Sequence, residues 1–421
     1  MVKKILIALV CLCALGANGQ NATISPYSYF GVGDIRNSGT VENQMMAGLQ
    51  MYADSIHLNL QNPAAYSSLR LTAYTAGISH KRFGLKDANE KQSESVTNLD
   101  YLSIGFPIAK NAGIGFGLMP YTSVGYNLNS QTLNEDGDTV TNVFAGEGGI
   151  NRVYLSLGYQ PFKDISIGAT VNYNFGELEY QRIQSVEDVQ FGTLDTRTSK
   201  INGFDFNYAL NYTPTFKDKY TLYAHVGVNT QVNLVSKNNE RLGSFSLDTG
   251  ADIEVIDVDL DASGLRNTEL KIPTVTTLGL GYGENKKWFI GGEYTFQQLS
   301  SFSNDFLQVQ NVEYTDASSF ALGSYFIPDY RSISSYFNRI TYRAGLRYDK
   351  TGMVVNNEEI NNFGITFGFG LPLGSNFSNI NLGFELGKRG TTDAGLIEEN
   401  YFKINVGLSL NDKWFIKRKI N

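Results

Sequence analysis

The stretch DISIGATVNYNFG, residues Asp164–Gly176, decides the fold. Apolar side chains occupy every second position from Ile165 to Phe175, and small or polar residues fill the positions between them. Because successive side chains of a strand point to opposite faces, this pattern predicts a strand with one apolar and one polar face. The same alternation recurs to the C-terminus in fourteen segments, and an even number of such strands closes an antiparallel transmembrane β-barrel.

The fourteen expected strands are mostly ten residues or longer, as a tilted membrane strand requires. They lie at about 70–79, 98–107, 111–124, 151–160, 164–176, 200–213, 220–235, 270–283, 286–297, 316–327, 338–349, 360–372, 379–388 and 400–410. Long and short gaps alternate between them, with 328–337 as the one long gap among the turns. Outer-membrane barrels have short periplasmic turns and long outer loops, so we expect both termini in the periplasm.

The N-terminus predicts export from the cytoplasm. Lys3 and Lys4 precede an apolar run over 5–15, and the small residues around Gly19 offer a cleavage site, so we interpret 1–19 as a cleaved signal peptide. Both cysteines lie inside this signal, which leaves the exported chain without disulfides. No later stretch has the 18 or so apolar residues of a membrane helix. These features predict an integral protein of the outer membrane of a Gram-negative bacterium.

Residues 20–69 differ from the rest because they lack a sustained period of two. They contain SPYSYFGVGDI (Ser25–Ile35) and QNPAAYSSL (Gln61–Leu69), which read as a compact irregular segment. We therefore expect a compact segment at 20–69 that is separate from a barrel formed by 70–421. The chain has 34 basic and 41 acidic residues, a net charge of −7, so nothing indicates the basic patch of a nucleic-acid binder.

The alternation also predicts which face of each strand meets lipid, since lipid accepts only apolar side chains. In the last strand Phe402, Ile404 and Val406 would face lipid, and Lys403 the lumen. A charge on the lipid side would cost roughly 2 to 4 kcal/mol for each Arg or Lys at the midplane. The same parity places a network of mixed charge inside the barrel, made of Arg339, Arg343, Arg347, Glu293, Glu385 and Lys403.

Aromatic residues gather where strands end, which is typical of the belts at the two membrane interfaces. The pairs are Tyr159 with Phe162, Trp288 with Phe289, and Trp414 with Phe415. The alternative is that they are ordinary core aromatics. The belt interpretation is favoured because the sequence offers no second layer for them to pack against.

Several segments together resemble the FadL-like family of outer-membrane transporters of long-chain fatty acids and other hydrophobic compounds. They are LKIPTVTTLGLGYGENKKWFIGGEYTFQQ (270–298), the hatch motif Asn62, Pro63 and Ala64, and GIGFGLMPY (113–121). The resemblance implies fourteen strands, an N-terminal hatch at 20–69 inside the lumen, and a kinked third strand that opens a gap in the wall. The opening SPYSYFGVGDI and the C-terminal DKWFIKRKIN depart from the family, which suits a divergent branch.

In this chain Pro120 interrupts the third strand and cannot donate a ladder hydrogen bond, so it is the candidate for the lateral gap. A simple strand end or bulge at the outer rim is an equally good interpretation. Apolar hatch residues need a ligand or mutual packing in a polar lumen, which makes Phe30, Met45, Met46 and Leu49 candidates for a ligand pocket. Mutual packing is the simpler alternative.

Other motifs are weaker. His57, His80 and His225 have no spaced partners for a metal, and Gly279, Gly281 and Gly283 lie on a strand, where they would make room for the hatch. Asp257, Asp259 and Asp261 alternate in an outer loop, so the acidic stretch 252–261 poses a calcium hypothesis against a solvated acidic face. We expect no cofactor, no metal and no catalytic set, and so no enzyme.

Two functions are open. The first is passive uptake of a hydrophobic small molecule, such as a long-chain fatty acid, by a monomeric channel that releases it sideways into membrane lipid. The second is a non-transporting barrel that serves as a subunit or docking partner of an outer-membrane secretion or barrel-assembly complex. Transport predicts an apolar pocket and a wall gap, whereas docking predicts a sealed barrel and an exposed apolar patch.

Overall fold

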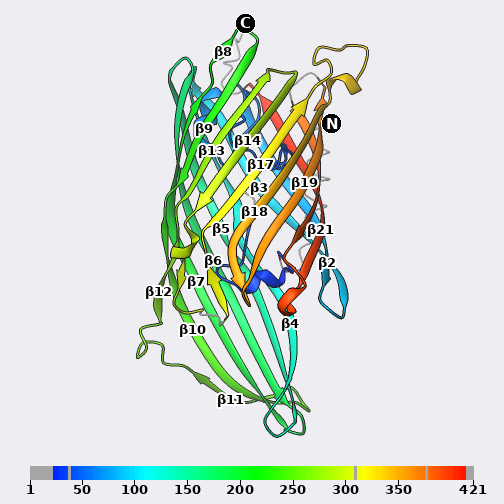
Figure 1. The fold of residues 1–421 in the computed structure, drawn as a ribbon. Helices are drawn as coiled ribbons and strands as arrows, with labels where there is room; N and C mark the ends of the chain where they lie inside the picture. Colours follow the sequence, from blue (N-terminus) through cyan, green and yellow to red (C-terminus); the bar gives the residue numbers. More distant parts are fainter. Residues whose placement is uncertain (1–21, 37–38, 308–310, 375–377, 414–421) are drawn as a thin grey trace, which may run out of the picture.

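The computed structural model describes residues 22–36, 39–307, 311–374 and 378–413, and its centre is a closed barrel of fourteen antiparallel strands (Figure 1). Ten strands are single elements: β2 (Thr72–Lys86), β3 (Lys91–Ala109), β4 (Ala112–Leu133), β5 (Thr139–Phe162), β6 (Ile165–Val186), β7 (Phe191–Tyr212), β18 (Thr341–Val355), β19 (Glu358–Leu373), β20 (Ser378–Arg389) and β21 (Glu398–Asp412). Pairing of β2 with β21 closes the wall.

The other four barrel strands are each formed by two consecutive elements. They are β9 (Tyr220–Asn229) with β10 (Val232–Ser246), β12 (Asn267–Ile272) with β13 (Val275–Glu284), β14 (Trp288–Gln297) with β15 (Ser303–Asn304), and β16 (Val312–Tyr314) with β17 (Ala317–Phe326). Three short strands lie outside this set, β1 (Asp34–Ile35), β8 (Thr215–Phe216) and β11 (Asp252–Asp257). All fourteen strands expected from the sequence are therefore present.

The two faces of β6 are as the alternation predicts. Asn172 and Asn174 point inward and are buried, whereas Val171 and Tyr173 are about 40% exposed on the outside. Neighbouring strands continue this apolar band around the barrel, for example with Leu155 on β5. A band of exposed apolar side chains around a polar interior is the surface that a bilayer covers.

The strands extend much farther beyond the band than the sequence suggests. β4, β5 and β6 have 22, 24 and 22 residues, and the expected outer loop 125–150 is mostly a paired hairpin with a turn near Gly137. On the extended part of β6 the inner side chain Leu178 is buried and the outer Glu177 is exposed. In this part of β6 the lumen-facing side chain is apolar and the outward-facing side chain is polar, because water replaces lipid around the barrel. The alternation that marked the membrane part of the strand is therefore lost here.

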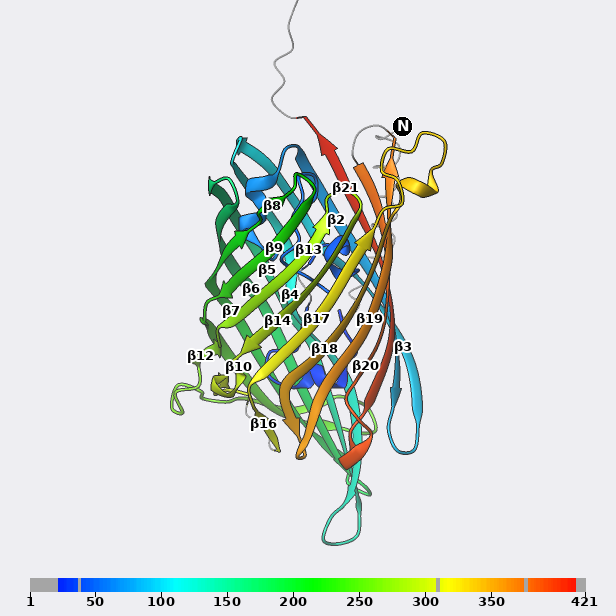
Figure 2. The same ribbon diagram turned by 45° about the horizontal axis from the view of Figure 1, so that its top comes forward.

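Residues 22–69 lie inside the barrel and form the hatch, shown in blue in Figure 2. Its elements are η1 (Pro26–Tyr29), β1 (Asp34–Ile35), α2 (Val41–Gln44) and η2 (Pro63–Ser68). Glycines on the wall make room for it: a Cβ on Gly168 of β6 would lie 2.3 Å from the backbone nitrogen of Ala64. Gly279 and Gly281 of β13 likewise face the side chain of Met51, as the sequence predicts. No helix in the described ranges is long and apolar enough to cross a membrane.

Two details of the wall differ from the expectations. Tyr159 and Phe162 are exposed at a strand end, but Phe289 is 1% exposed because it points into the lumen against Tyr52 of the hatch. The expected pair Trp414 and Phe415 lies outside the described residues. β18 begins only at Thr341, so Ile340 is buried at its start instead of facing lipid.

Candidate functional site

The wall has a break between β3 and β4. Pairing of these strands runs from Ala109 opposite Ala112 to Leu102 opposite Leu118 and ends there. Beyond that point β3 continues paired with β2, and β4 continues paired with β5. The two long hairpins consequently separate toward the end of the barrel that carries the long hairpins (Figure 2).

Pro120 lies two residues beyond the last β3–β4 pair. It is opposite Asn151 of β5, and the register of the β4–β5 ladder shifts between Pro120 and Thr122. Proline lacks the N–H that a ladder needs, and a bulge bends the strand that carries it. The break in the wall thus begins next to the residue that the sequence singles out. Passage of a substrate through the break stays a prediction.

The hatch fills the part of this break that lies next to Pro120. Its short strand β1 pairs antiparallel with β4, with Asp34 opposite Ser123 and Ile35 opposite Thr122. The next residue, Arg36, donates its backbone N–H to Tyr121 and forms an ion pair of 2.9 Å with Asp100 of β3. The hatch is therefore bonded to both sides of the break. We call Arg36 and Asp100 the latch.

The latch has further polar partners. Asp100 is the bulged residue of β3, and its Oδ1 also accepts a hydrogen bond from Ser79 of β2. A second guanidinium nitrogen of Arg36 donates to the backbone oxygen of Ala22, which also accepts from Asn98 of β3. The Asp100 side chain is buried, with 5% exposure, and the Arg36 side chain is mostly covered, with 13% exposure. A buried ion pair of this kind is strongly destabilised when one partner is removed.

Behind the latch is a cavity of about 530 Å³ in the lumen. Ile35, Val96 and Tyr121 line it next to the break, and Phe30 lines it from the hatch. Twelve of its lining residues are ionisable Asp, Glu, Lys or Arg side chains; they are Asp34, Arg36, Lys81, Arg152, Asp205, Glu293, Arg347, Asp349, Lys350, Glu385, Arg389 and Lys403. Sites for small hydrophobic molecules are mostly apolar with few polar groups, so the charge density here is high for such a ligand.

Charges in the lumen are largely paired with one another. Arg347 bonds Glu385 at 3.1 Å and Asp349 at 3.0 Å, and Tyr401 donates its hydroxyl to Glu385. On the hatch side Arg389 of β20 pairs with Asp34 at 2.8 Å. Burial alone would raise the pKa of the Asp34 carboxyl, but Arg389 and Lys81 outweigh it, and the pKa is lowered. Arg347 and Glu385 therefore belong to a network of mixed charge.

The other predicted network residues have different partners. Lys403 bonds Gln44 of α2 at 3.1 Å, and Arg343 bonds Asn381 of β20 at 3.2 Å. Arg339 is not on the lumen face of a strand, because it lies in the short turn η4 (Phe337–Arg339) and stacks against Tyr336. Its predicted place in the network rested on starting that strand three residues too early.

Glu293 of β14 has no basic partner among the described residues. Its carboxylate accepts the backbone N–H groups of Gln50 and Met51 at 2.6–2.9 Å, so it holds the hatch by its main chain. Asn62 of the hatch motif also anchors the chain, since its amide nitrogen donates to the backbone of Gln50 and to Asn211 of β7. The neighbouring Pro63 and Ala64 pack against Gly168 on the wall.

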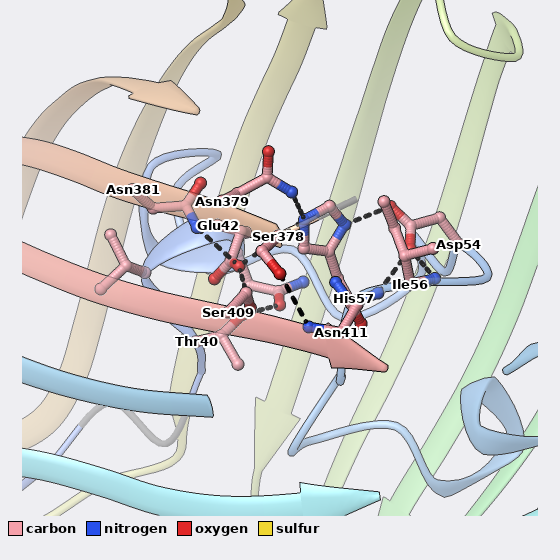
Figure 3. Close-up of polar contacts among 12 residues, drawn as sticks. Thr40, Glu42, Asp54, Ile56, His57, Ser378, Asn379, Asn381, Ser409 and Asn411 are labelled. Atoms are coloured by element: carbon pink, nitrogen blue, oxygen red, sulfur yellow. Dashed lines mark hydrogen bonds and ion pairs between the residues drawn. The ribbon is translucent and has the colours of Figure 1, made fainter. Parts of the chain in front are cut away.

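A polar cluster fixes the hatch to β20 and β21 (Figure 3). Glu42 of α2 accepts hydrogen bonds from Asn381 at 2.8 Å and from Ser409 at 2.9 Å. His57 lies 2.5 Å from Asp54 and 3.9 Å from Glu42. Burial lowers the pKa of His57, but the nearby Asp54 and Glu42 outweigh it and raise the pKa above its ordinary value. The cluster thus places His57 between two carboxylates that favour its protonated form.

The four candidate pocket residues divide into two groups. Met45, Met46 and Leu49 are at most 1% exposed and pack in apolar clusters between the hatch and the wall. Met45, for example, faces Gly368 and Gly383, which have no side chain to obstruct it. Only Phe30 lines the cavity. Mutual packing therefore accounts for three of the four.

Within the described ranges no group of three or more His, Cys, Asp or Glu side chains could hold a metal ion. In the outer acidic stretch Asp257 is paired with Arg241 and Asp261 with Arg266. His225 is buried beside Asn62 and Asn211, and the exposed His80 bonds Thr97.

Sequence reasoning missed the latch and the His57 cluster, because both join hatch residues to wall residues far away in the chain. Asp100 did give a signal. It is a lone carboxylate inside an apolar and polar alternation, next to Leu99 and Leu102, both of which are exposed. Two outward apolar residues three apart require a bulge between them.

Comparison with known proteins agrees with this fold. The family model BamG matches residues 1–421, the whole chain. Similar solved structures include the CymD monoaromatic hydrocarbon channel, with 12% identity, a TM-score of 0.57, and coverage of 91% of this chain and 99% of that chain. The toluene transporter TbuX of Ralstonia pickettii has 13% identity, a TM-score of 0.57, and coverage of 92% and 99%.

A FadL homologue of Pseudomonas aeruginosa is similar as well, with 11% identity, a TM-score of 0.56, and coverage of 89% and 98%. No curated protein matches the chain. At such identities the solved structures show a shared fold, and the expected resemblance to FadL-like outer-membrane barrels is confirmed at that level.

Proposed function

The chain belongs to the BamG family, and on that premise we propose that it is a non-transporting barrel that serves as a subunit or docking partner of an outer-membrane protein complex. The observation that carries this proposal is the closure of the wall break by the hatch. The latch bonds the hatch to β3 and β1 bonds it to β4, so the interior is closed at the place where a channel would open.

The interior supports the same proposal. The cavity behind the latch has twelve ionisable Asp, Glu, Lys or Arg side chains in its lining, and its charges are largely satisfied by each other, as in Arg347 with Glu385. A hydrophobic cargo would have to desolvate these groups, and uncompensated burial of charge is expensive. Some of these pairs join wall strands to one another, as Arg347 with Glu385 does, and others join the hatch to the wall, as Asp34 with Arg389 does. With the hatch bonded to the wall on both sides of the break, the outer surface of the barrel is the part that partners can reach.

The outer surface supports it as well. Strands β4 to β7 and β10 project far beyond the apolar band, and Figure 1 shows them at the lower end of the barrel. Apolar side chains are exposed there, for example Leu133, Phe191 and Ile253, at 51–72%. These side chains are accessible to a partner protein that contacts the projecting sheet.

A locked hatch provides the test. Ile35 of β1 and Thr122 of β4 are direct partners in the ladder, at a spacing that suits a disulfide. We expect the Ile35→Cys, Thr122→Cys double variant, oxidised in the membrane, to retain stoichiometric protein partners after extraction in mild detergent. The reduced form of the same protein is the matched control. Purification of the oxidised and reduced forms alike as single chains, at endogenous expression, would contradict the proposal.

A second candidate is passive uptake of a hydrophobic compound, and two observations favour it. The wall does have a break beside Pro120, and a cavity of about 530 Å³ lies directly behind it. The similar solved structures include a monoaromatic hydrocarbon channel and a toluene transporter. In this case the hatch would have to move so that the compound could leave sideways into lipid.

The same locked variant separates the two candidates. Protein reconstituted into liposomes is supplied with toluene or with a fluorescent long-chain fatty acid, and the flux is compared before and after reduction. Uptake predicts flux that appears only when the disulfide is reduced. The docking proposal predicts the same low flux in both states, equal to that of empty liposomes.

A further inference from the structure

The outer part of β4 is an edge strand that nothing in the described chain covers. β4 pairs with β5 up to Leu133, but its other side loses β3 after Leu118 and has β1 only at Thr122 and Ser123. From Asn127 to Leu133 the residues are exposed, apart from the half-buried Leu128. An edge strand presents a row of unpaired N–H and C=O groups to any strand that approaches it.

The direction of these groups follows from the bonds already made. Both the N–H and the C=O of Gly125 bond the hydroxyl of Ser28 in the hatch, so the backbone of Gly125 points away from β5. Because the direction alternates along an antiparallel strand, Asn127, Asn129 and Gln131 also direct their backbone groups to the open side. Three consecutive pairing positions are therefore available.

The edge lacks the usual protection. Natural edge strands carry lysine, proline, inward charges or strong bulges that prevent pairing with other chains. Between Val124 and Leu133 the sequence is VGYNLNSQTL, which has no charged residue and no proline. The first positions of the same edge already accept β1 as an antiparallel neighbour. The edge is thus both open and able to take a strand.

The charge of the hairpin around this edge indicates which kind of strand would bind there. The hairpin over 124–150 contains Glu135, Asp136, Asp138 and Glu147 and no lysine or arginine. The rest of the projecting sheet is acidic as well, with Glu177 and Asp252 exposed. A strand that approaches this region is attracted when it carries positive charge.

We propose that a partner protein docks by adding an extended, basic strand antiparallel to β4 at Asn127–Leu133. Main-chain hydrogen bonds would supply the affinity, and the acidic hairpin would select the partner. The added strand would lie farther along β4 than the latch. It would continue the sheet that β1 begins at Thr122 and Ser123. This inference rests on the proposed docking function and gives it a location.

The test uses the full-length chain in detergent and a synthetic nine-residue peptide that alternates threonine and lysine. Hydrogen exchange read by mass spectrometry should show slower exchange over 127–133 when the peptide is added, and no change with the threonine and glutamate counterpart. The effect should weaken as salt is raised. Absence of protection by the lysine peptide, or equal protection by the glutamate peptide, would overturn the proposal.

A proline variant tests the main-chain bonds. Asn129→Pro removes one outward N–H and leaves the β5 side of the ladder intact, so it should weaken peptide binding tenfold or more. Asn129→Thr keeps the N–H and should bind as the unchanged chain does. If Asn129→Pro fails to fold, the exchange measurement on the unchanged chain still decides the matter. Concentration-dependent protection without peptide would instead assign the edge to a second copy of this chain and refute the partner strand.

Failure of this proposal is distinguishable from failure of the docking function. If Asn129→Pro copurifies with the same protein partners as the unchanged chain, docking holds and the β4 edge is not its site. If neither form has a partner, the docking function itself fails.

Discussion

Arg36 and Asp100 are the residues on which closure of the wall depends. We expect Arg36→Met to leave the Asp100 carboxylate buried with only Ser79 and the distant Lys403, at 3.9 Å, as partners. Loss of one partner of a buried pair costs about 3 to 5 kcal/mol, enough to free the local segment. Hydrogen exchange over 30–36 should become faster while the barrel strands keep their protection.

The double variant Arg36→Met, Asp100→Asn is the matched control. It removes both charges, so it should restore much of the lost protection, because no uncompensated charge remains. If the single variant exchanges as slowly as the unchanged chain, the latch does not hold the hatch.

His57 and Asp54 give the hatch a pH dependence of known sign. The pKa of His57 is raised in the folded protein, so its contribution is fully present below the unfolded pKa and is lost as pH rises through the folded pKa. Burial raises the pKa of Asp54, but His57 outweighs it and the pKa is lowered. The contribution of Asp54 is present above its unfolded pKa and is lost as pH falls through its folded pKa.

The hatch should consequently be held most tightly at pH values above the folded pKa of Asp54 and below the folded pKa of His57. Limited proteolysis of 50–60 as a function of pH measures this: cleavage should increase at the alkaline end in the unchanged chain. His57→Gln should be cleaved at a rate that no longer changes across that end. A proteolysis profile that is the same in both proteins would refute the role of this pair.

At the scale of elements, the sequence predicted the membrane part of each strand and missed the outer part. Within the membrane, lipid outside and polar groups inside impose a clean alternation, as on β6. Beyond the membrane, water lies outside and Leu178 and Tyr180 lie inside, so the same strand changes its pattern and its end is hidden. For the same reason a long outer loop was expected where the β4–β5 hairpin continues.

The contact between hatch and wall is set by backbone, and glycine allows it. Gly168→Ala would place a Cβ 2.3 Å from the nitrogen of Ala64, where only backbone could shift. We expect this variant to displace η2 and to lower thermal stability, while the heat-modifiable band of the barrel persists on gels. Gly292→Ala is the control, since its nearest atom would be at 3.6 Å. Equal melting temperatures for the two variants would show that η2 does not pack as described.

At the scale of the whole molecule, fourteen strands and closure followed from periodicity and gap lengths, the internal hatch was implied by the family resemblance, and the wall is as expected. The site did not follow in the same way. Pro120 marked the break, but the latch joins residues 64 positions apart, and the bulge at Asp100 that places the carboxylate is a tertiary feature. Function depends on whether the hatch closes the break in the wall or opens it. The alternation of apolar and polar residues along the strands does not indicate which of the two happens.

Native mass spectrometry tests the central claim most directly. The chain is extracted in mild detergent from its own outer membrane, without overexpression, and its assemblies are weighed. The docking account predicts a complex heavier than the single mature chain, with protein partners in fixed stoichiometry and no bound hydrophobic compound. A single chain that carries an acyl chain or an aromatic hydrocarbon in its lumen would contradict it.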